Sequence, residues 1–365
     1  MNQIIYFSNE RSEFLSRELG WKFKKREQLR NLIGSTTGDY STSYVLMVGH
    51  DLNEIKILNN LGSKRVWVFL YADETYIPKL NFFVLQKASV IGTIRAYPTS
   101  SQNLVRALFG LFRSWMTPIK ETPSYKRKEL LFSTPRGIMF LFRKHFVSSL
   151  HRLFNKQTLS LVPGYTNLFA KAYCDLFKMP LSSDASLLER EGPPIRANVP
   201  RKYLLNFVGQ EGKWWRQYAI WKASNHLNES EFTLKKRFGF GGTIGSNNAS
   251  LVSAKEYVEA LASSKFTLCP PGNYSYGSFR ILEALAARSV PLMAPNSSWD
   301  ASFEPIPGRP MYGILEDSWD AQFARLKLFS EDELRELRER HIVDLKSYFQ
   351  LINGVILGYK SDLYY

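Results

Sequence analysis

Short, unbroken runs of hydrophobic residues alternate with helical segments along the chain. Residues 44–48, 65–71 and 88–94 form such runs, which are typical of strands buried on both faces of a parallel sheet. The same alternation returns further along, where it predicts strands at 203–208, 265–269 and 290–294 and helices at 213–227, 256–262 and 277–287. This spacing of strands and helices predicts βαβ units and a doubly wound sheet, and therefore an α/β fold.

A segment rich in proline and charge separates the two groups of strands. Residues 189–202, EREGPPIRANVPRK, hold three prolines and one glycine, a composition typical of a linker. We therefore expect two α/β domains in series with a cleft between them, at residues 1–197 and 198–330. A helical segment, 331–365, follows, and its amphipathic helix over 331–350 is expected to pack back across the domains.

Basic residues are concentrated in one part of the chain. The net charge is +15, and residues 101–160 contribute eleven Lys and Arg against two acidic residues, interleaved with groups such as Phe109 and Phe112. Two interpretations remain open: helices near 103–116 and 138–155 that pack into a core with a solvated basic side, or a peripheral contact with anionic lipid. No nucleic-acid partner is expected, because no reader motif accompanies the charge.

Composition excludes several classes of protein. Hydrophobic residues make up 44% of the chain, too many for a disordered protein. The two cysteines, Cys174 and Cys269, cannot build a disulfide framework or a zinc cluster, which favours a reducing compartment. The sequence shows neither a signal-peptide pattern at its start nor an apolar run long enough to span a membrane. We therefore expect a cytoplasmic location, with peripheral contact to the inner membrane face left open.

The strongest local signal for chemistry lies in residues 264–285. A buried strand is expected to end at the Pro-Pro-Gly of 270–272, before a helix that begins near Ser278. Ligands of open α/β sheets bind beyond the carboxyl ends of the strands, next to helix N-termini that suit phosphate. Arg280 and Glu283 share a helix face, where the arginine could clamp a diphosphate and the carboxylate could accept two ribose hydroxyls. A surface ion pair is the alternative.

This segment also resembles a known family. SKFTLCPPG followed by SFRILEALAARSVPLMAP is similar to the C-terminal signature of the exostosin family of glycosyltransferases, as is FVGQ at 207–210 with Arg216 after it. At 288–289 the chain departs from the pattern, with Arg-Ser where the family usually has Gly and often Cys. Looser similarity to bacterial or viral exostosin-like N-terminal domains lies at 69–74, 94–97 and 162–165.

The resemblance implies a GT-B fold, with two Rossmann-like doubly wound domains facing a cleft. It implies that residues 1–197 bind an acceptor, that 198–330 bind a nucleotide sugar, and that transfer inverts the anomeric carbon. Carried over residue by residue, it gives a donor site of Arg280, Glu283, Gly272, Asn273, Ser278, Gly209 and Arg216.

No metal or other cofactor is expected. The chain has no Asp-x-Asp, the usual metal-binding signature of the other glycosyltransferase fold, and its five histidines lack metal-ligand spacing. An arginine and a helix dipole could instead stabilise the departing nucleoside diphosphate.

An inverting transfer also needs a general base, and a carboxylate is the usual choice. Asp73 and Glu74 follow a predicted strand at its carboxyl end and are the candidate catalytic residues. An N-cap or a loop ion pair is the alternative role for both. Asp51 is the next candidate base, and His50 beside it is a weaker one.

The sequence therefore predicts a hexosyltransferase that moves a sugar from a nucleotide-diphosphate sugar, with a UDP-sugar expected, to a glycan or lipid-linked glycan during surface polysaccharide synthesis. The competing hypothesis is a non-catalytic basic α/β protein that binds anionic lipid or nucleic acid, for which the charge is the only support.

Overall fold

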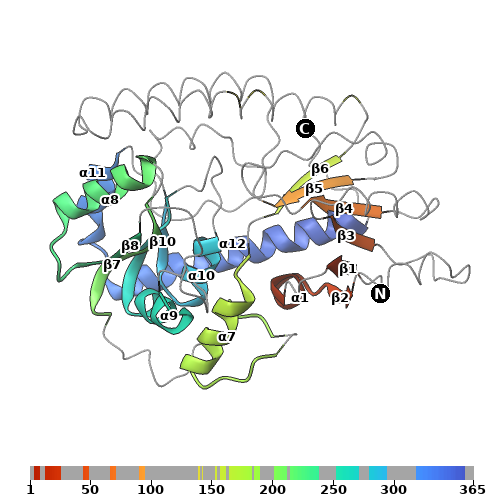
Figure 1. Ribbon diagram of the computed structural model, residues 1–365, viewed down its shortest axis with the longest axis horizontal. Coiled ribbons are helices and arrows are strands. Elements are labelled where there is room, and N and C mark those ends of the chain that lie inside the picture. Colours follow the sequence, from red (N-terminus) through yellow and green to blue (C-terminus); the bar gives the residue numbers. More distant parts are fainter. Residues whose placement is uncertain are drawn as a thin grey trace, which may run out of the picture.

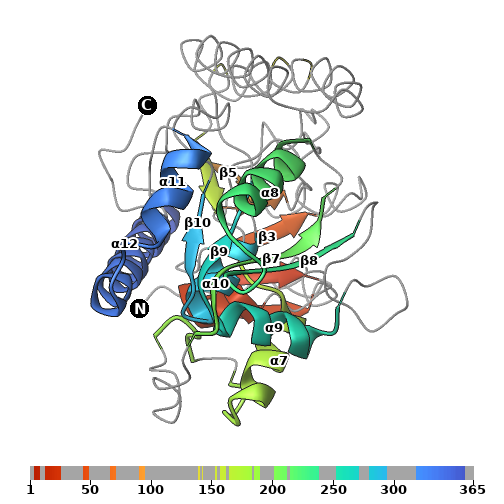
Figure 2. The same ribbon diagram turned by 90° about the vertical axis from the view of Figure 1, so that its left-hand side faces the viewer.

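The computed structural model shows a mixed α/β protein with two parallel β-sheets (Figures 1 and 2). This confirms the α/β class that the alternation of strands and helices predicts. The structure describes residues 4–8, 13–25, 44–48, 66–70, 90–94, 139, 142, 153, 157–161, 164–182, 185–189, 201–211, 214–237, 252–270, 279–293 and 318–357.

The first sheet has six parallel strands in the order β2-β1-β3-β4-β5-β6. Helix α1 (Glu13–Leu19) connects β1 to β2. The inner strands β3, β4 and β5 lie where unbroken hydrophobic runs predict them. The strands are β1 (Ile5–Ser8), β2 (Lys22–Lys25), β3 (Tyr44–Val48), β4 (Val66–Leu70), β5 (Val90–Ile94) and β6 (Gln157–Leu161).

The second sheet has four parallel strands in the order β10-β9-β7-β8. Its strands are β7 (Tyr203–Gln210), β8 (Phe232–Arg237), β9 (Ser264–Leu268) and β10 (Val290–Leu292). The helices between them are α8 (Trp214–His226), α9 (Ala254–Ala262) and α10 (Phe279–Ala286). The three predicted strands and the three predicted helices are therefore present, within a few residues at each boundary, whereas β8 was not predicted.

Helices cover both faces of the second sheet. One hydrophobic cluster joins β7, β9 and β10 to α8 and to α11 (Trp319–Leu326), through side chains such as Phe207, Ile220 and Phe323. A second cluster joins α9 and α10 to the opposite face, through side chains such as Val258 and Leu282. The sheet is therefore wound on both sides.

The strand order fixes where a ligand would bind in this sheet. The chain runs from β7 outward to β8, and then returns to place β9 on the other side of β7. The direction of winding reverses between β7 and β9. In open α/β sheets, ligands bind at such a switch point, beyond the carboxyl ends of the strands. The ends of β7 and β9 are therefore the place to examine for a site.

Helix α7 (Asn167–Leu176) follows the first sheet in the chain but packs against α9 of the second (Figures 1 and 2). The rings of Phe169 and Tyr257 meet edge to face at 6.3 Å between centroids. Thr166 forms the N-cap of α7, and its hydroxyl accepts a hydrogen bond from Phe169 N. The N-terminus of α7 is thus fixed beside the second sheet.

Helix α12 (Glu331–Leu357) contacts β10 of the second sheet and α1, the helix between β1 and β2 of the first sheet (Figure 1). Near its start, Arg338 Nε donates to Leu285 O at the end of α10. Near its end, Asn353 accepts a hydrogen bond from Trp21 Nε1 at 2.7 Å and donates one to Leu19 O at 3.0 Å. The helix therefore ties the second sheet to α1 and β2.

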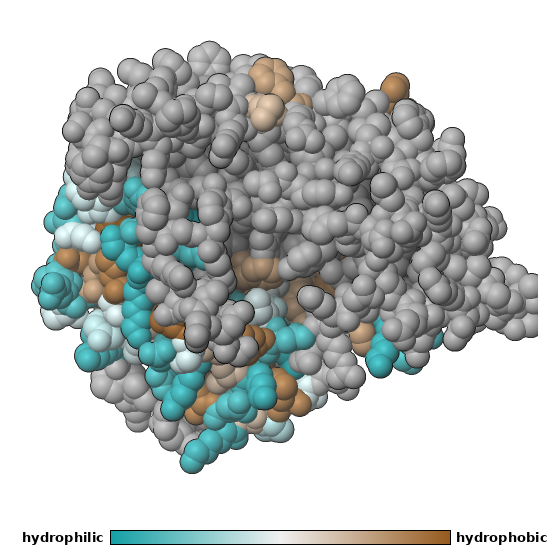
Figure 3. Space-filling view, viewed as in Figure 1, coloured by the Kyte–Doolittle hydropathy of each residue, from teal (hydrophilic) through white to brown (hydrophobic). Residues whose placement is uncertain are grey.

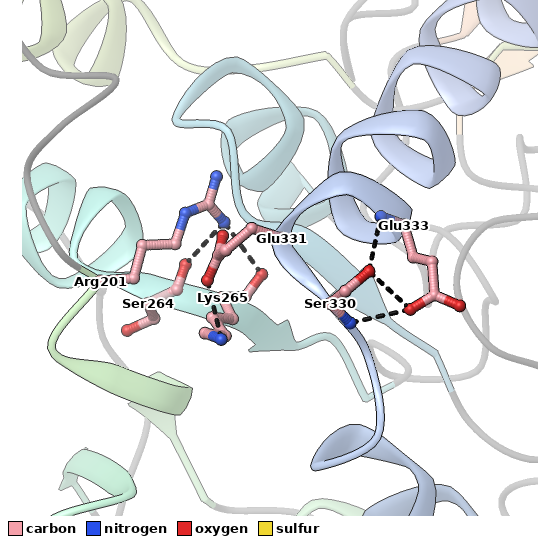
Figure 4. A network of polar contacts seen from close by, with 6 residues as sticks. All are labelled: Arg201, Ser264, Lys265, Ser330, Glu331 and Glu333. Atoms are coloured by element: carbon pink, nitrogen blue, oxygen red, sulfur yellow. Dashed lines mark hydrogen bonds and ion pairs between the residues drawn. The ribbon is translucent and has the colours of Figure 1, made fainter.

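A polar network marks the amino-terminal edge of the second sheet (Figure 4). Arg201 Nη1 donates to Ser264 O and Lys265 O, each at 3.3 Å, and Lys265 forms a 2.7 Å ion pair with Glu331. Beside it, Ser330 and Glu333 exchange hydrogen bonds in a capping box that begins α12. This polar network lies at the edge opposite the switch point.

Arg288 occupies a backbone conformation that usually selects glycine. It follows α10 with φ of +63°, and Ser289 N donates to Ala284 O across the helix end. This is a Schellman turn, in which a non-glycine residue costs about 1–2 kcal/mol. Arg288 and Ser289, where the chain departs from the exostosin pattern, therefore form a turn that a glycine would adopt more readily.

On the face seen in Figure 3, hydrophilic residues alternate with smaller hydrophobic areas, as expected for helices that face water. Within residues 101–160, Met139, Phe142 and Leu153 are exposed, with 58%, 52% and 75% of their surface accessible. The other residues proposed for lipid contact in this stretch lie outside the described part of the chain. Among the described helices, none combines the length and hydrophobicity needed to cross a membrane.

Candidate functional site

A guanidinium lies across the carboxyl end of β7, at the switch point of the second sheet. Arg280 Nη2 donates a 2.9 Å hydrogen bond to Val208 O, and the guanidinium lies over the Phe207 ring at 4.7 Å from its centroid. Arg280 is the second residue of α10 and is only 7% exposed. The carbonyl and the ring hold this positive charge in a fixed orientation.

Gly209 makes this placement possible. A Cβ on residue 209 would lie 2.3 Å from Arg280 Nη2, closer than any real contact of this kind. Only a residue without a side chain therefore lets the guanidinium approach β7. A Cβ at residue 209 would force the end of the Arg280 side chain to shift, so the observed position of the guanidinium depends on Gly209.

A second arginine reaches the same strand end from α8. Arg216 Nη1 donates to Gln210 O at 3.3 Å, and Gln210 is the last residue of β7. Two guanidinium groups from different helices therefore converge on one carboxyl end. Such an arrangement suits a ligand that carries several negative charges, such as a diphosphate.

Glu283 lies one helical turn after Arg280 and is buried, with 3% of its surface exposed. Its Oε2 accepts a 2.8 Å hydrogen bond from the Tyr257 hydroxyl in α9. Its Oε1 accepts two longer hydrogen bonds, both of 3.4 Å, from the backbone N and the hydroxyl of Thr166. The carboxylate therefore joins three helices: α7, α9 and α10.

The charge of Glu283 is subject to opposing influences. Burial raises the pKa of Glu283, and the hydrogen bonds from Tyr257 and Thr166 and the nearby charge of Arg280 act in the other direction. The N-terminus of α7, capped by Thr166, also favours a negative group beside it. Burial has the largest effect, so the pKa of Glu283 lies above its usual value.

Tyr257 and Cys269, two titratable residues near Glu283, stay neutral at neutral pH. Burial, together with the charge of Glu283, raises the pKa of Tyr257 well above its usual value. Burial raises the pKa of Cys269 to about 12, so its thiol remains protonated at neutral pH. Cys269 is therefore a packing residue rather than a nucleophile, and Tyr257 is available as a hydrogen-bond donor.

The structure brings four of the expected donor-site residues to one region: Arg280, Glu283, Gly209 and Arg216. Arg280 and Glu283 share α10, as their spacing predicts, but they contact different neighbours, since the arginine reaches β7 and the carboxylate reaches α7 and α9. The other candidate site residues lie outside the described residues: Gly272, Asn273, Ser278, Asp73, Glu74, Asp51 and His50.

Sequence reasoning missed two residues of this region, Thr166 and Tyr257. They stand 117 and 26 positions from Glu283 in the chain, so no local spacing connects them to it. One signal for Thr166 was present, because it directly follows the VPGY of 162–165 and precedes a helical pattern. In the sequence, the position of Tyr257 is typical of the buried face of an amphipathic helix. In the structure, Tyr257 does lie on the buried face of α9.

His226 and His341, the histidines of the described segments, have the contacts or burial of structural residues. His226 Nε2 contacts Asp320 Oδ1 at 2.7 Å, and Lys222 contacts the other oxygen of the same carboxylate at 2.8 Å. His341 is buried in α12. Within the described part of the chain, no group of three or more His, Cys, Asp or Glu residues is arranged to hold a metal ion.

Comparisons with known proteins bear on the same region. No curated protein matches the chain significantly. Among solved structures, one described as an alpha1,3-fucosyltransferase is similar at 11% identity and a TM-score of 0.40, over 100% of this chain and 92% of that chain. Residues 189–302 match the model of the RXYLT1 C-terminal domain, a glycosyltransferase family. This range contains β7 to β10 and the four donor-site candidates that lie together, Arg280, Glu283, Gly209 and Arg216. The match points to a glycosyltransferase.

Proposed function

We propose that the chain is an inverting, metal-independent glycosyltransferase of GT-B type that uses a nucleotide-diphosphate sugar, with a UDP-sugar as the expected donor. The observation that carries this proposal is the convergence of Arg280 and Arg216 on the carboxyl end of β7. This place is the switch point of the second sheet, and it lies inside the range that matches a glycosyltransferase family.

The chemistry of sugar transfer explains why arginines belong there. When the bond between the sugar and the diphosphate breaks, negative charge develops on the leaving oxygen. Fixed positive groups lower the barrier most when they are already in place, because no reorganisation is then needed. Arg280 meets this condition, since Val208 O and the Phe207 ring hold its guanidinium before any ligand binds.

Glu283 has a separate role in this proposal, that of binding the donor. An ionised carboxylate can accept hydrogen bonds from two ribose hydroxyls, which would orient the nucleoside relative to the arginines. The position of Glu283 supports this role, because it follows Arg280 by one turn of α10. Gly272, Asn273 and Ser278, between β9 and α10, complete the proposed donor site.

The proposal assigns no metal to the reaction, because the sequence contains no Asp-x-Asp and the arginines supply positive charge. A carboxylate of residues 1–197 acts as the general base that takes the proton of the acceptor hydroxyl. Asp73 and Glu74, which follow β4 along the chain, are the proposed groups, and Asp51, which follows β3, is the next candidate.

The acceptor in this proposal is a glycan or a lipid-linked glycan. The basic, aromatic stretch of residues 101–160 would bring the enzyme to anionic lipid at the inner face of a membrane, where such an acceptor is found. The exposed side chains of Met139, Phe142 and Leu153 are consistent with a surface of this kind. In this proposal the enzyme is cytoplasmic and acts next to its acceptor.

A nucleotide-release assay tests the proposed reaction. The full chain is incubated with a panel of UDP-, GDP- and CMP-sugars, with and without excess EDTA, and nucleotide release is measured. We expect hydrolysis of one donor class, with equal rates in the two conditions. Activity that is lost with EDTA and restored by manganese would contradict metal independence. A complete lack of turnover and of nucleotide-sugar binding would support a non-catalytic binding protein instead.

A further inference from the structure

The two oxygens of the Glu283 carboxylate are held unequally. Among the described residues, Oε2 accepts one short hydrogen bond, of 2.8 Å, from the Tyr257 hydroxyl. Oε1 accepts its two hydrogen bonds from Thr166 at 3.4 Å, close to the limit for such contacts. One oxygen is therefore firmly fixed, and the other is loosely held by groups that a better donor could replace.

Tyr257 is well placed to fix a side chain in this way. It is 2% exposed and its ring packs against Phe169 of α7, so its hydroxyl has little freedom to move. A tyrosine hydroxyl that stays protonated can only donate to a carboxylate. The capping box of Ser253 and Glu256 fixes the start of α9, and with it the position of Tyr257 in the first turns of that helix.

We propose that Tyr257 is a positioning residue for donor binding: its hydroxyl anchors Oε2 of Glu283, so that Oε1 faces the ribose hydroxyls of the nucleotide sugar and exchanges its weak bonds with Thr166 for bonds with the ligand. This inference rests on the proposed donor-binding role of Glu283. Tyr257 touches neither the sugar nor the diphosphate in this account and acts entirely through Glu283.

If the ligand replaces Thr166 as the hydrogen-bond donor to Oε1, the contact between α7 and Glu283 is lost. Thr166 caps α7, which follows the first sheet in the chain, whereas Glu283 lies in α10, a helix that packs on the second sheet. A ligand that takes over Oε1 would release the contact between Glu283 and the α7 N-terminus, while Tyr257 retains the other oxygen. The Thr166 hydroxyl still has Phe169 N as a partner, so α7 keeps its cap.

Substitution of Tyr257 by Phe removes the anchoring hydroxyl and keeps the ring. We expect the Kd for the nucleotide sugar to rise by about 10-fold, equivalent to about 1.4 kcal/mol. Once donor is saturating, kcat should change little, because the leaving group still meets Arg280. The control is Tyr6→Phe, which removes a hydroxyl from an equally buried tyrosine of β1 that contacts Ser16. That variant should bind donor like the parent.

A double-mutant cycle separates positioning from packing. If Tyr257 acts through Glu283, Tyr257→Phe should weaken donor binding in the parent but have no further effect in a Glu283→Gln background. Equal effects in both backgrounds would show that Tyr257 acts on its own, and would overturn the proposal. An unchanged Kd for Tyr257→Phe would overturn it as well.

The pH dependence of donor binding provides a readout that packing alone would not move. Among the residues that the structure describes, the titratable and charged groups that interact with Glu283 are Tyr257, Cys269 and Arg280. Because the Tyr257 hydrogen bond lowers the pKa of Glu283, the acid limb of donor binding should move to higher pH in Tyr257→Phe. An acid limb at the parental pH would contradict the proposal.

Failure of this inference can be told apart from failure of the proposed function. If the parent binds no nucleotide sugar, the proposed function itself is wrong. If the parent binds donor and Glu283→Gln weakens binding, but Tyr257→Phe does not, only the positioning role is wrong.

Discussion

At the residue scale, the site depends on a close approach between a side chain and a strand. Arg280 reaches Val208 O because residue 209 has no side chain. The sequence predicted Arg280 and Gly209 separately, through motifs 71 positions apart, but it could not show that one makes room for the other. Such a dependence arises only when strand and helix are folded together.

This dependence predicts different effects for two glycine substitutions. Gly209→Ala should displace the Arg280 guanidinium, with a loss of about 1 kcal/mol of stability and roughly 10-fold weaker donor binding. Gly354→Ala, the control, places a Cβ in open space within α12 and should stabilise the chain by about 0.5–1 kcal/mol. Thermal unfolding and donor titration of both variants provide the test. Parental donor affinity in Gly209→Ala would show that the guanidinium position is unimportant.

A buried histidine predicts how stability depends on pH. Burial lowers the pKa of His341 to about 4; the charge of Asp344 raises this pKa, and the charge of Arg340 lowers it further. The unfolded chain, with an ordinary histidine pKa near 6.5, therefore binds the proton more readily than the folded chain. The stability from neutral His341 is fully present above about pH 6.5 and is lost as the pH falls toward about 4.

Denaturant unfolding of the parent and of His341→Gln between pH 7 and pH 4.5 measures this contribution. The parent should lose up to about 1.4 kcal/mol per pH unit more than the variant across this window. Parallel pH profiles for the two proteins would mean that His341 does not titrate in this way.

At the element scale, the hydrophobic inner strands β3, β4, β5, β7 and β9 and the edge strand β10 were predictable, whereas the inner strand β1 and the edge strands β2, β6 and β8 were not. β3 and β4 are unbroken hydrophobic runs, as expected for strands with neighbours on both sides. β2 (KFKK) and β8 (FTLKKR) lie at sheet edges, and their lysines hide the strand pattern. Charged residues on an edge strand protect the sheet from pairing with another chain. The lysines that make these strands hard to predict therefore also benefit the fold.

The position of α7 shows a second limit of prediction. Its residues follow the first sheet and precede the linker, so the sequence assigns them to residues 1–197. In the structure, α7 packs against α9 of the second sheet and presents Thr166 to Glu283. Packing partners of an amphipathic helix depend on which hydrophobic face is nearest in space, which sequence order does not specify.

Helix α12 provides a prediction at this scale. Asn353→Ala removes both the acceptor for Trp21 Nε1 and the donor for Leu19 O, leaving two groups that are largely shielded from water without their partner. We expect a loss of about 1–3 kcal/mol of stability. Ser347→Ala, at an exposed site on the same helix, should cost less than about 0.5 kcal/mol. Denaturant unfolding compares them, and equal losses would contradict the bridging role of Asn353.

At the scale of the whole molecule, the uneven charge predicts binding to anionic membranes. Residues 101–160 carry a net charge of +9, and a basic residue near an anionic surface contributes about 1 kcal/mol. The protein should sediment with anionic but not with neutral vesicles. Charge reversal at Arg113, Arg143 and Lys144 should reduce this binding.

The control for membrane binding reverses the same number of charges elsewhere, at the exposed residues Lys171, Lys178 and Lys255. This variant should keep most of the binding. No sedimentation of the parent with anionic vesicles at low salt would contradict the prediction, and equal losses in both variants would indicate unspecific attraction by net charge.

The central claim is that the carboxyl end of β7 binds a nucleotide sugar through Arg280. The most direct test is the shift in melting temperature that nucleotide sugars produce in the parent, in Arg280→Ala and in Arg201→Ala. Arg201 is the matched control, because it also donates to backbone carbonyls of the second sheet but at the opposite edge (Figure 4). Ligand at 100 times its Kd stabilises a protein by about 2.7 kcal/mol, a shift of several degrees. We predict this shift in the parent and in Arg201→Ala, and its loss in Arg280→Ala. A parental shift in Arg280→Ala, or no shift in the parent with any nucleotide sugar, would contradict the account.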